Sequence, residues 1–362
     1  MTDAKTSRAR LARLEHEFAA DIAAVALLLD LPTAKRDAEQ LGRSWRAACV
    51  SHSALRTLVR DIWRETATRR TPASGDRAAL HDLHIAAKDV RSRLRDWARY
   101  ARIVERQITP EAAPLFQEVG EPGTHLDIMG HVSRLFFDAL HAVANPAART
   151  QSDKAHEAMH YRDIPLPMVQ FLDLIGAAYR VCLAQRGTHP LRFLDVGSGG
   201  GTKVLAATCC FDICHGLEFE DHTVATGTAL LKMLGADQCT LMQGDAMRFD
   251  NYGNYDVIYF YRPLKLEALM IDMEARIFSQ ARRGTILLAP SGLMTPNPEQ
   301  HGVRSVSGFV YVTGLNEAEV QVLHDEARHI GPCIPGHNPD HVSDCGFWEP
   351  LRDVCRRNGY LI

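Results

Sequence analysis

The sequence lacks the features that would place the protein in a membrane, outside the cell or on a nucleic acid. In 362 residues no apolar run can span a bilayer, because the stretch from Phe18 to Leu31 is short and contains Asp21 and Asp30. Nine irregularly spaced cysteines, an odd number, argue against a secreted disulfide framework. The formal net charge of −3 gives no general attraction to a polyanion. We therefore expect a cytoplasmic protein that binds neither membrane nor nucleic acid.

The pattern that is present differs between the two halves of the chain. In residues 1–150, apolar side chains recur at steps of three and four, for example Phe18, Ile22, Val25 and Leu29, which is typical of amphipathic helices. The Pro- and Ala-containing stretch at residues 145–152 is the best candidate for a linker. We predict an all-α domain in residues 1–150 that acts as a cap, a lid or a dimerisation element, and a second domain in residues 151–362.

The second half alternates apolar strands with helices. Nearly continuous apolar runs are typical of parallel strands that are buried on both faces. A helix is expected from Asp221 to Leu234, with Asp221 as N-cap and Gly235 just past its end. This alternation predicts an α/β domain with a doubly wound, mostly parallel sheet. The first three predicted strands end at residues 196, 218 and 243. Three further strands are predicted over residues 255–261, 284–290 and 310–312.

One loop carries the strongest functional signal. An apolar strand ending in Asp195 runs into Gly197, Gly199 and Gly201, and a helix follows from Thr202. Glycines permit positive φ and close approach of a ligand, and the N–H groups at a helix start face that ligand. The loop predicts a nucleotide cofactor. The dinucleotide fingerprint G-x-G-x-x-G fails at Thr202, and the spacing is D-x-G-x-G-x-G instead.

This loop resembles that of the class I S-adenosylmethionine-dependent methyltransferases, which have a Rossmann-like fold. The resemblance implies S-adenosylmethionine as cofactor, with its cationic methionine part over the loop. Glu218 follows at about the distance expected of an acid that binds ribose hydroxyls. The resemblance implies that Asp245, within Gly244-Asp245-Ala246, accepts a hydrogen bond from the adenine amino group. The full set of residues that we expect at the cofactor is Asp195, Gly197, Ser198, Gly199, Gly201, Thr202, Glu218, Gly244, Asp245, Ala246 and Tyr261.

Each acid also has a structural interpretation. Glu220 is an equally acidic neighbour that could replace Glu218 at the ribose. Asp245 could cap the turn that contains Met247 and Arg248, and Asp195 could cap its own loop.

Two segments are candidates for the acceptor side. His160, Tyr161 and Arg162 precede the first helix of the second domain, where many proteins of the resembled family close over the cofactor. We take Tyr161 and Arg162 as contacts and His160 as a candidate base, with an inter-domain hinge as the alternative. Tyr261-Arg262-Pro263 occupies the place of the Asn/Asp-Pro-Pro-Tyr/Phe motif of amino methyltransferases and departs from it. Arg262 would then pair with a carboxylate of the acceptor, unless it simply points outward at a turn.

Two groups of potential metal ligands have simpler explanations. His125, Asp127 and His131 lie in one predicted helix, where a partly buried capping region accounts for them. A second set, Cys333, His337, His341 and Cys345, has the ligand types of a structural zinc site. It lacks the close Cys pair of known zinc modules, and its prolines prevent a single helical face. We therefore assign no metal.

The sequence thus predicts a methyltransferase that uses S-adenosylmethionine and a small-molecule acceptor, with a homodimer as a possible assembly. Methyl transfer is an in-line displacement, so alignment and enclosure matter more than strong acid catalysis. One alternative is an enzyme that transfers or cyclises the aminocarboxypropyl arm and releases methylthioadenosine. Another is a non-catalytic partner protein that retains the fold.

Overall fold

A computed structural model describes residues 4–68, 76–116, 125–144, 151–161, 166–186, 190–331 and 346–360. The chain forms two compact units. Unit 1 comprises residues 1–111, 331–333 and 338–362, and unit 2 comprises residues 112–330 and 334–337. This division differs from the predicted boundary at residue 150. Most of the predicted linker, residues 145–150, lies outside the described residues.

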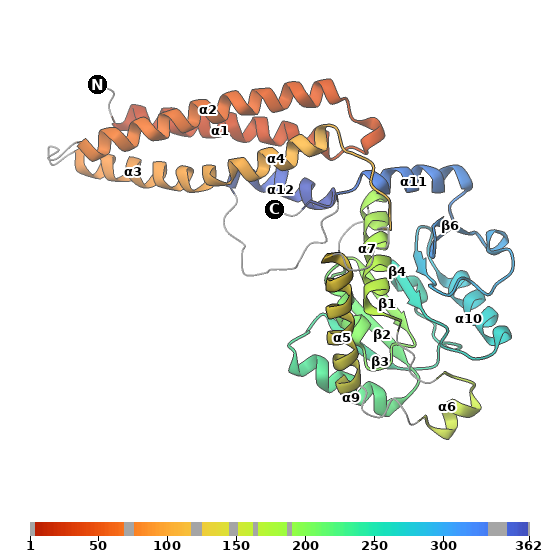
Figure 1. The fold of residues 1–362 in the computed structure, drawn as a ribbon. Coiled ribbons are helices and arrows are strands. Elements are labelled where there is room, and N and C mark those ends of the chain that lie inside the picture. The colour runs from red at the N-terminus through yellow and green to blue at the C-terminus, as the bar shows by residue number, and fades with distance from the viewer. Residues whose placement is uncertain are drawn as a thin grey trace. The chain divides into compact units, whose positions relative to one another are not determined.

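Unit 1 is built from long helices, as the spacing of apolar residues predicts (Figure 1). In the first helix the side chains of Leu11, Phe18, Ile22, Val25 and Leu29 are buried, which is the predicted stripe. The helices are α1 (Ala4–Leu29), α2 (Ala38–Thr68), α3 (Asp76–Arg93), α4 (Trp97–Ile108) and α12 (Glu349–Arg357), with short 3-10 turns η1 (Thr33–Lys35), η2 (Leu94–Asp96) and η6 (Gly346–Trp348).

The C-terminal segment completes the core of unit 1. Trp348 is 1% exposed, stacks on Tyr100 with ring centroids 4.3 Å apart, and meets Phe18 edge-on. A buried polar network joins the same elements: the Asn358 Nδ2 group donates to the Leu29 carbonyl (3.0 Å) and to Gln107 Oε1 (2.7 Å). Because buried polar groups need partners, this network fixes the return of the chain as firmly as the apolar contacts do.

Unit 2 contains a seven-stranded sheet in the order β3-β2-β1-β4-β5-β7-β6 (Figure 1). Strands β1 to β5 are parallel, and β7 runs antiparallel to both of its neighbours, β5 and β6. The predicted doubly wound, mostly parallel sheet is therefore confirmed. Its strands are β1 (Arg192–Val196), β2 (Ile213–Glu218), β3 (Cys239–Gln243), β4 (Val257–Phe260), β5 (Ile286–Leu288), β6 (Val303–Ser307) and β7 (Val310–Thr313).

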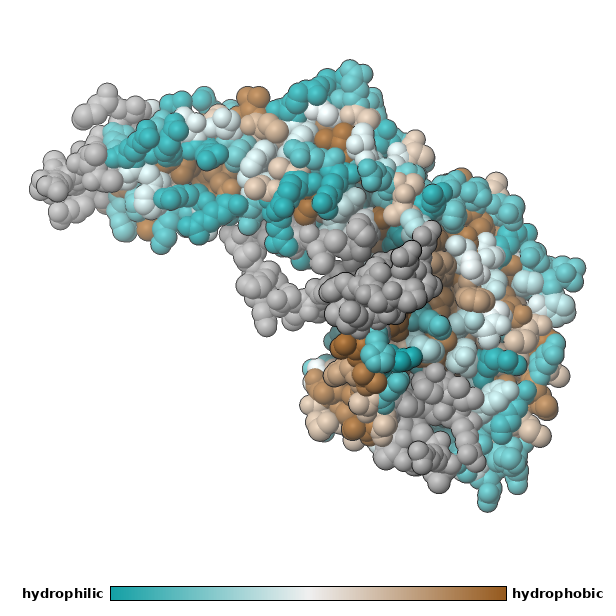
Figure 2. All heavy atoms as spheres, viewed as in Figure 1, coloured by the Kyte–Doolittle hydropathy of each residue, from teal (hydrophilic) through white to brown (hydrophobic). Residues whose placement is uncertain are grey.

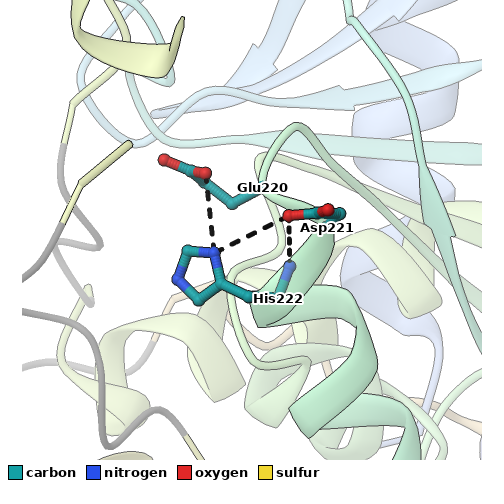
Figure 3. Close-up of side chains that lie close together, drawn as sticks. All are labelled: Glu220, Asp221 and His222. Atoms are coloured by element: carbon teal, nitrogen blue, oxygen red, sulfur yellow. Dashed lines mark hydrogen bonds and ion pairs between the residues drawn. The ribbon is translucent and has the colours of Figure 1, made fainter. Parts of the chain in front are cut away.

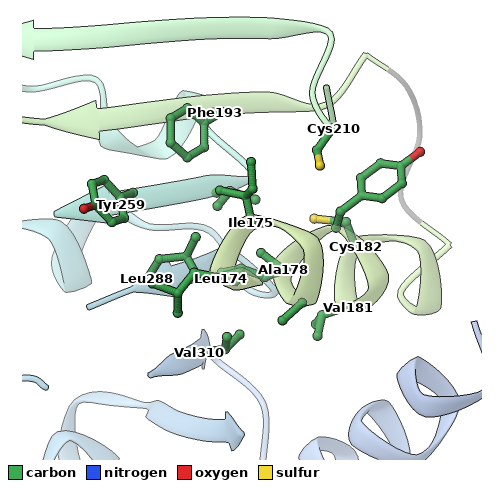
Figure 4. Packing of buried hydrophobic residues seen from close by; sticks show 14 of the residues in the cluster. Leu174, Ile175, Ala178, Val181, Cys182, Phe193, Cys210, Tyr259, Leu288 and Val310 are labelled. Atoms are coloured by element: carbon green, nitrogen blue, oxygen red, sulfur yellow. The ribbon is translucent and has the colours of Figure 1, made fainter. Parts of the chain in front are cut away.

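Alternate residues of the strands supply two cores on opposite faces of the sheet. Phe193 and Tyr259 belong to the core that includes side chains of α7, α8 and α11, part of which Figure 4 shows. Leu194 and Ile258 belong to the core that includes α10. The helices of unit 2 are α5 (His125–Ala144), α6 (Asp153–Glu157), α7 (Met168–Ala184), α8 (Thr202–Ala207), α9 (Asp221–Met233), α10 (Glu267–Gln280) and α11 (Glu317–His329), with 3-10 turns η3 (Tyr252–Asn254) and η4 (Pro298–His301).

Helix α5 explains why unit 2 begins before the predicted boundary. It packs on α7, α8 and α9, with Phe137 against the core of that face. Its outer side leaves apolar side chains in solvent, and Figure 2 shows apolar surface in brown where α5 lies. Among the described side chains of α5, the exposed large apolar ones are Val132, Leu135, Phe136 and Val143. The homodimer remains a prediction.

The elements that position the site lie close to their predicted places, and two details differ. Strand β6 was not predicted, because the run from Val303 to Ser307 has only two apolar residues. Glu220, and not Asp221, is the N-cap residue of α9. As predicted, Gly235 lies just past the end of this helix, one residue beyond the C-cap, Leu234, with φ of +66° as a helix-ending glycine requires. Within the described ranges, no helix is both long and apolar enough to cross a membrane.

Candidate functional site

The glycine loop lies at the carboxyl end of β1, between the ends of β2 and β4. Gly197, Gly199 and Gly201 all have positive φ, at +81°, +53° and +79°. A Cβ at Gly197 would lie 2.9 Å from the Cβ of Pro263, so the loop also packs too closely for a larger residue. The loop ends at Gly201, the N-cap residue of α8, and Thr202 begins that helix. The expectation that these glycines turn the backbone with positive φ is confirmed.

Glu218 ties the glycine loop to the loop that follows β2. Its Oε2 accepts the N–H of Gly199 at 2.8 Å, and its Oε1 accepts the N–H of Glu220 at 2.9 Å. Two charge-assisted hydrogen bonds hold the carboxylate at the carboxyl edge of the sheet, which is where doubly wound sheets bind ligands.

Glu220 is turned away from the glycine loop. Its Oε1 accepts the N–H of Ser152 at 2.9 Å, and its Oε2 lies 3.6 Å from Nδ1 of His222. Figure 3 shows this contact beside that of Asp221 with His222. The geometry therefore favours Glu218 over Glu220 as the acid next to a ligand on the loop.

Glu220, Asp221 and His222 place three potential ligand atoms within 4.8 Å of one another, the only such group among the described residues. They begin α9, where carboxylates are stabilised by the helix dipole. That position explains the group without an ion. The expected absence of a metal remains a prediction.

Asp245 has the capping role that the sequence allowed. Its Oδ1 accepts the N–H of Met247 at 2.8 Å, and its Oδ2 lies 3.7 Å from Nε of the exposed Arg248. The preceding Gly244 donates its N–H to the carbonyl of Glu218 at 2.8 Å. The Gly244-Asp245-Ala246 turn is thereby joined to the end of β2, and its assignment to adenine stays a prediction.

Two buried hydroxyls near Asp195 have no hydrogen-bond partner among the described residues. They are Oγ of Ser198 in the glycine loop and the hydroxyl of Tyr259 in β4. Asp195 is itself buried and pairs in register with Tyr259. Burial raises the pKa of Tyr259 well above its usual value, and the nearby Asp195 and Tyr261 add to this rise. Because an unpartnered buried hydroxyl costs free energy, these two atoms are suited to a polar ligand at this edge.

The segment from Gln151 to Tyr161 also reaches this edge of the sheet. Tyr161 donates its N–H to the carbonyl of Pro263 at 3.1 Å, and Lys265 donates its N–H to the carbonyl of Met159 at 2.8 Å. These two hydrogen bonds flank the pairing of His160 with Leu264. Two of the predicted acceptor-side segments, His160-Tyr161 and Tyr261-Arg262-Pro263, are thus joined directly.

The side chain of His160 lies over the loop that follows Glu218. Its ring stacks on Phe219 at a centroid distance of 4.2 Å, and Nζ of Lys154 lies 4.9 Å from the same phenyl centroid. Burial lowers the pKa of His160, although Asp245 and Glu220 oppose this shift. His160 is therefore a neutral imidazole near pH 7, beside the carboxylates of Asp245 and Glu220.

Arg262 holds an unusual backbone conformation for a non-glycine residue. Its φ is +46°, and it lies two residues past the end of β4, directly before the proline that packs on Gly197. Such strain often accompanies a ligand site. The side chain is exposed, as the outward-facing alternative expects, whereas Tyr261 is half-buried. Arg162 lies outside the described residues.

Three comparisons with known proteins give different results. No family model matches the sequence, and no curated protein matches it. Three similar solved structures are the YcgJ protein of Bacillus subtilis, an RNA methyltransferase of Salinibacter ruber with S-adenosylhomocysteine, and the magnesium protoporphyrin IX methyltransferase of Synechocystis with S-adenosylmethionine. Their sequence identities are 16%, 20% and 14%, and their TM-scores are 0.26, 0.30 and 0.32.

The alignments cover 31%, 41% and 51% of this chain and 49%, 90% and 93% of those chains. The chain thus spans about half the length of YcgJ (49%). The TM-scores are low, so the fold is assigned from the seven-stranded sheet itself, with β1 to β5 parallel and helices over both faces. The fold is that of the class I methyltransferases.

Among the remaining ligand candidates, only His131 has a described side chain. Nδ1 of His131 lies 2.9 Å from Nη2 of the exposed Arg134, and the side chains of His125 and Asp127 are not among the described ones. The group Cys333, His337, His341 and Cys345 lies outside the described residues.

The tertiary structure adds residues to the site at the carboxyl edge of the sheet that the sequence did not single out. Tyr259 comes in because it is the neighbour of Asp195 in β4. Ser152 contacts Glu220 by a hydrogen bond, and Phe219 stacks on the ring of His160. The alternation in Tyr259-Phe260-Tyr261 was a usable signal for Tyr259, since residues 195 and 259 both precede their strand's end. Ser152 and Phe219 had no comparable signal.

Proposed function

We propose that unit 2 is an S-adenosylmethionine-dependent methyltransferase that acts on a small-molecule acceptor. One observation carries the proposal: three alternate glycines with positive φ form a loop whose middle N–H is held by Glu218. The cofactor would supply a methyl group on a sulfonium. The unpartnered hydroxyls of Ser198 and Tyr259 beside the buried Asp195 fit a polar, cationic ligand.

The residues would divide the cofactor between them. Asp195, Ser198, Thr202 and the three glycines would hold the methionine part. The carboxylate of Asp195 would pair with its ammonium, and the loop N–H groups would donate to its carboxylate. Glu218 would accept hydrogen bonds from the ribose hydroxyls, and the Gly244-Asp245-Ala246 turn would hold the adenine. Tyr261 would close the site from the end of β4.

The acceptor would enter beside Tyr161 and Arg262. A small molecule is favoured over a nucleic acid, because the carboxyl edge carries Glu218, Glu220, Asp221 and Asp245, and the whole chain has a net charge of −3. Acidic groups around the opening repel phosphates. Arg262 would pair with an acceptor carboxylate, and His160, neutral near pH 7, would accept a proton or serve as a wall beside Phe219.

The first experiment is mass spectrometry of the purified protein with S-adenosylmethionine, with and without an extract of small metabolites. S-adenosylhomocysteine that appears only with extract supports the methyltransferase. Methylthioadenosine that appears without extract favours the enzyme that attacks the aminocarboxypropyl arm. Binding of S-adenosylmethionine without either product favours a non-catalytic protein.

The binding roles are tested with Glu218→Gln and, as a matched control, Asp221→Asn. Glu218 bonds the glycine loop, whereas the Asp221 side chain is 89% exposed at the start of α9. Loss of a charged acceptor costs about 1.5–3 kcal/mol, so calorimetry should find Kd roughly 10- to 100-fold weaker for Glu218→Gln. Equal affinities of both variants and the natural protein would contradict the ribose role.

A further inference from the structure

Five cysteines of unit 2 gather at the edge of the sheet opposite to the glycine loop. Cys182 lies in α7, Cys209 and Cys210 follow the last turn of α8, and Cys214 and Cys239 are neighbours in register in β2 and β3. Cys182 and Cys210 point toward one another (Figure 4). All five are free thiols, so this edge of the sheet concentrates soft ligands.

Cys209 and Cys210 are arranged as a pair. Their Sγ atoms lie 3.6 Å apart, although adjacent residues in a turn need not point their side chains together. Cys209 is half-buried and accessible, whereas Cys210 is 6% exposed. The two thiols share a hydrogen bond, which lowers the pKa of Cys209, while this bond and burial raise the pKa of Cys210.

The sulfur separation suits chelation. A tetrahedral cation with metal–sulfur bonds of about 2.3 Å holds its sulfurs about 3.8 Å apart. The observed 3.6 Å therefore needs only a small adjustment. Disulfide formation would need the sulfurs to approach to about 2.05 Å. In this conformation the pair is closer to the geometry of a chelate than to that of a disulfide.

The pair is separate from the proposed cofactor site. The glycine loop begins α8, and Cys209 and Cys210 follow its end. The six residues of α8 span about 9 Å. A ligand on the cysteines would therefore not occupy the glycine loop.

We propose that Cys209 and Cys210 form a chelating site for a thiophilic metal or metalloid ion. With a trivalent arsenic oxide, two As–S bonds form, the As=O bond is lost, and the oxygen leaves as water with both thiol protons. Arsenic stays trivalent, so no oxidant or reductant is needed. With a divalent cation, two metal–sulfur bonds form and two protons pass to the buffer.

The test uses the full chain, reduced with a phosphine that is then removed, and two probes. Phenylarsine oxide, which takes two thiols, is followed by intact mass, and Cd²⁺ by its sulfur-to-metal charge-transfer absorbance. The variants are Cys209→Ser and Cys210→Ser. The controls are Cys49→Ser, a half-buried thiol of unit 1, and the double variant Cys333→Ser/Cys345→Ser.

The natural protein and both controls should gain one arsenical with loss of one water. Loss of either sulfur removes the chelate, so affinity should fall on the order of a hundredfold or more in Cys209→Ser and Cys210→Ser. Cd²⁺ binding with the same dependence extends the site to metals, and its absence restricts the site to metalloids. An adduct that persists in Cys209→Ser with unchanged circular dichroism, or that is lost in either control, overturns the proposal.

Discussion

At the scale of single residues, the site depends on how closely backbones approach the glycine loop. Gly227 shows this from the side of α9: a Cβ there would lie 2.7 Å from the carbonyl oxygen of Gly200 and 2.5 Å from Cδ1 of Leu241. The sequence shows only a glycine inside a predicted helix, where an alanine is intrinsically better. The fold reverses that preference, because backbone meets backbone at this point.

Gly227→Ala should therefore destabilise unit 2 in spite of its helix propensity. Propensity favours alanine by about 1 kcal/mol, and overpacking against a backbone costs about 1–3 kcal/mol. The net effect should be a lower free energy of unfolding and a weaker Kd for S-adenosylmethionine. Thr228→Ala, at an exposed position of the same helix, supplies the propensity gain alone. Equal free energies of unfolding for the two variants would show that the glycine loop moves to make room for the added Cβ without loss of stability.

His52 makes unit 1 sensitive to acid. It is buried and stacks on Trp97 at a centroid distance of 3.8 Å, and burial lowers its pKa to about 4. In the unfolded chain its pKa is about 6.5. Above that pH both states are neutral at this group. Between pH 6.5 and 4 only the unfolded chain takes up the proton, so stability falls over this range and levels off below it.

The contribution of His52 should reach at most roughly 3 kcal/mol at pH 4. Urea denaturation of the natural protein and of His52→Phe, at pH 7 and pH 4.5, measures it. We expect the natural protein to lose more stability than the variant on acidification. The same loss in both would mean that His52 is accessible to protons in the folded state.

At the scale of elements, α12 and η6 are the parts of unit 1 that are remote in sequence. Phe347, Trp348, Leu351 and Val354 join the core that α1 to α4 form. A chain that leaves unit 1 at residue 111 and returns after residue 330 closes a long loop, so these contacts must offset the entropy of that closure.

Trp348→Ala should destabilise unit 1 by about 3–5 kcal/mol, the usual range for removal of a buried large aromatic. The indole also donates a hydrogen bond to the carbonyl of Arg93 at 2.8 Å, which would be left unsatisfied. Circular dichroism during chemical denaturation measures the effect. Val50→Ala, at a side chain that is 71% exposed on α2, should change stability by less than about 0.5 kcal/mol.

At the scale of the whole molecule, the two units have separate hydrophobic cores. The core of unit 1 contains residues from α1 to α4, η6 and α12, and the two cores of unit 2 contain the sheet and its helices. All four tryptophans, at positions 45, 63, 97 and 348, belong to unit 1. Their fluorescence therefore reports unit 1, whereas far-UV circular dichroism reports both units.

Unfolding followed by these two signals should give transitions that do not coincide. S-adenosylmethionine at 100 times its Kd should stabilise unit 2 by about 2.7 kcal/mol. It should therefore shift the dichroism transition of unit 2 and leave the fluorescence transition of unit 1 unchanged. Coincident transitions that move together with the cofactor would show that the chain unfolds as one cooperative unit, in disagreement with the separate cores.

The sequence by itself determined what depends on local spacing. Steps of three and four predict the helices of unit 1, continuous apolar runs predict the parallel strands, and the spacing from Asp195 to Gly201 predicts the loop and its positive φ. These features follow from neighbours along the chain, because the helix and strand periods act over a few residues. The capping role of Asp245 was within reach for the same reason.

Only the tertiary structure decided the contacts between remote segments. The place of Tyr259 beside Asp195, the contact of Ser152 with Glu220, the approach of Cys210 to the thiols of Cys182 and Cys214, and the return of Trp348 to unit 1 have no local signature. The unit boundary was missed for this reason, since α5 follows the helical half in sequence but packs on unit 2. The periodicity of a sequence shows which face of an element is apolar. It does not show which other element packs against that face.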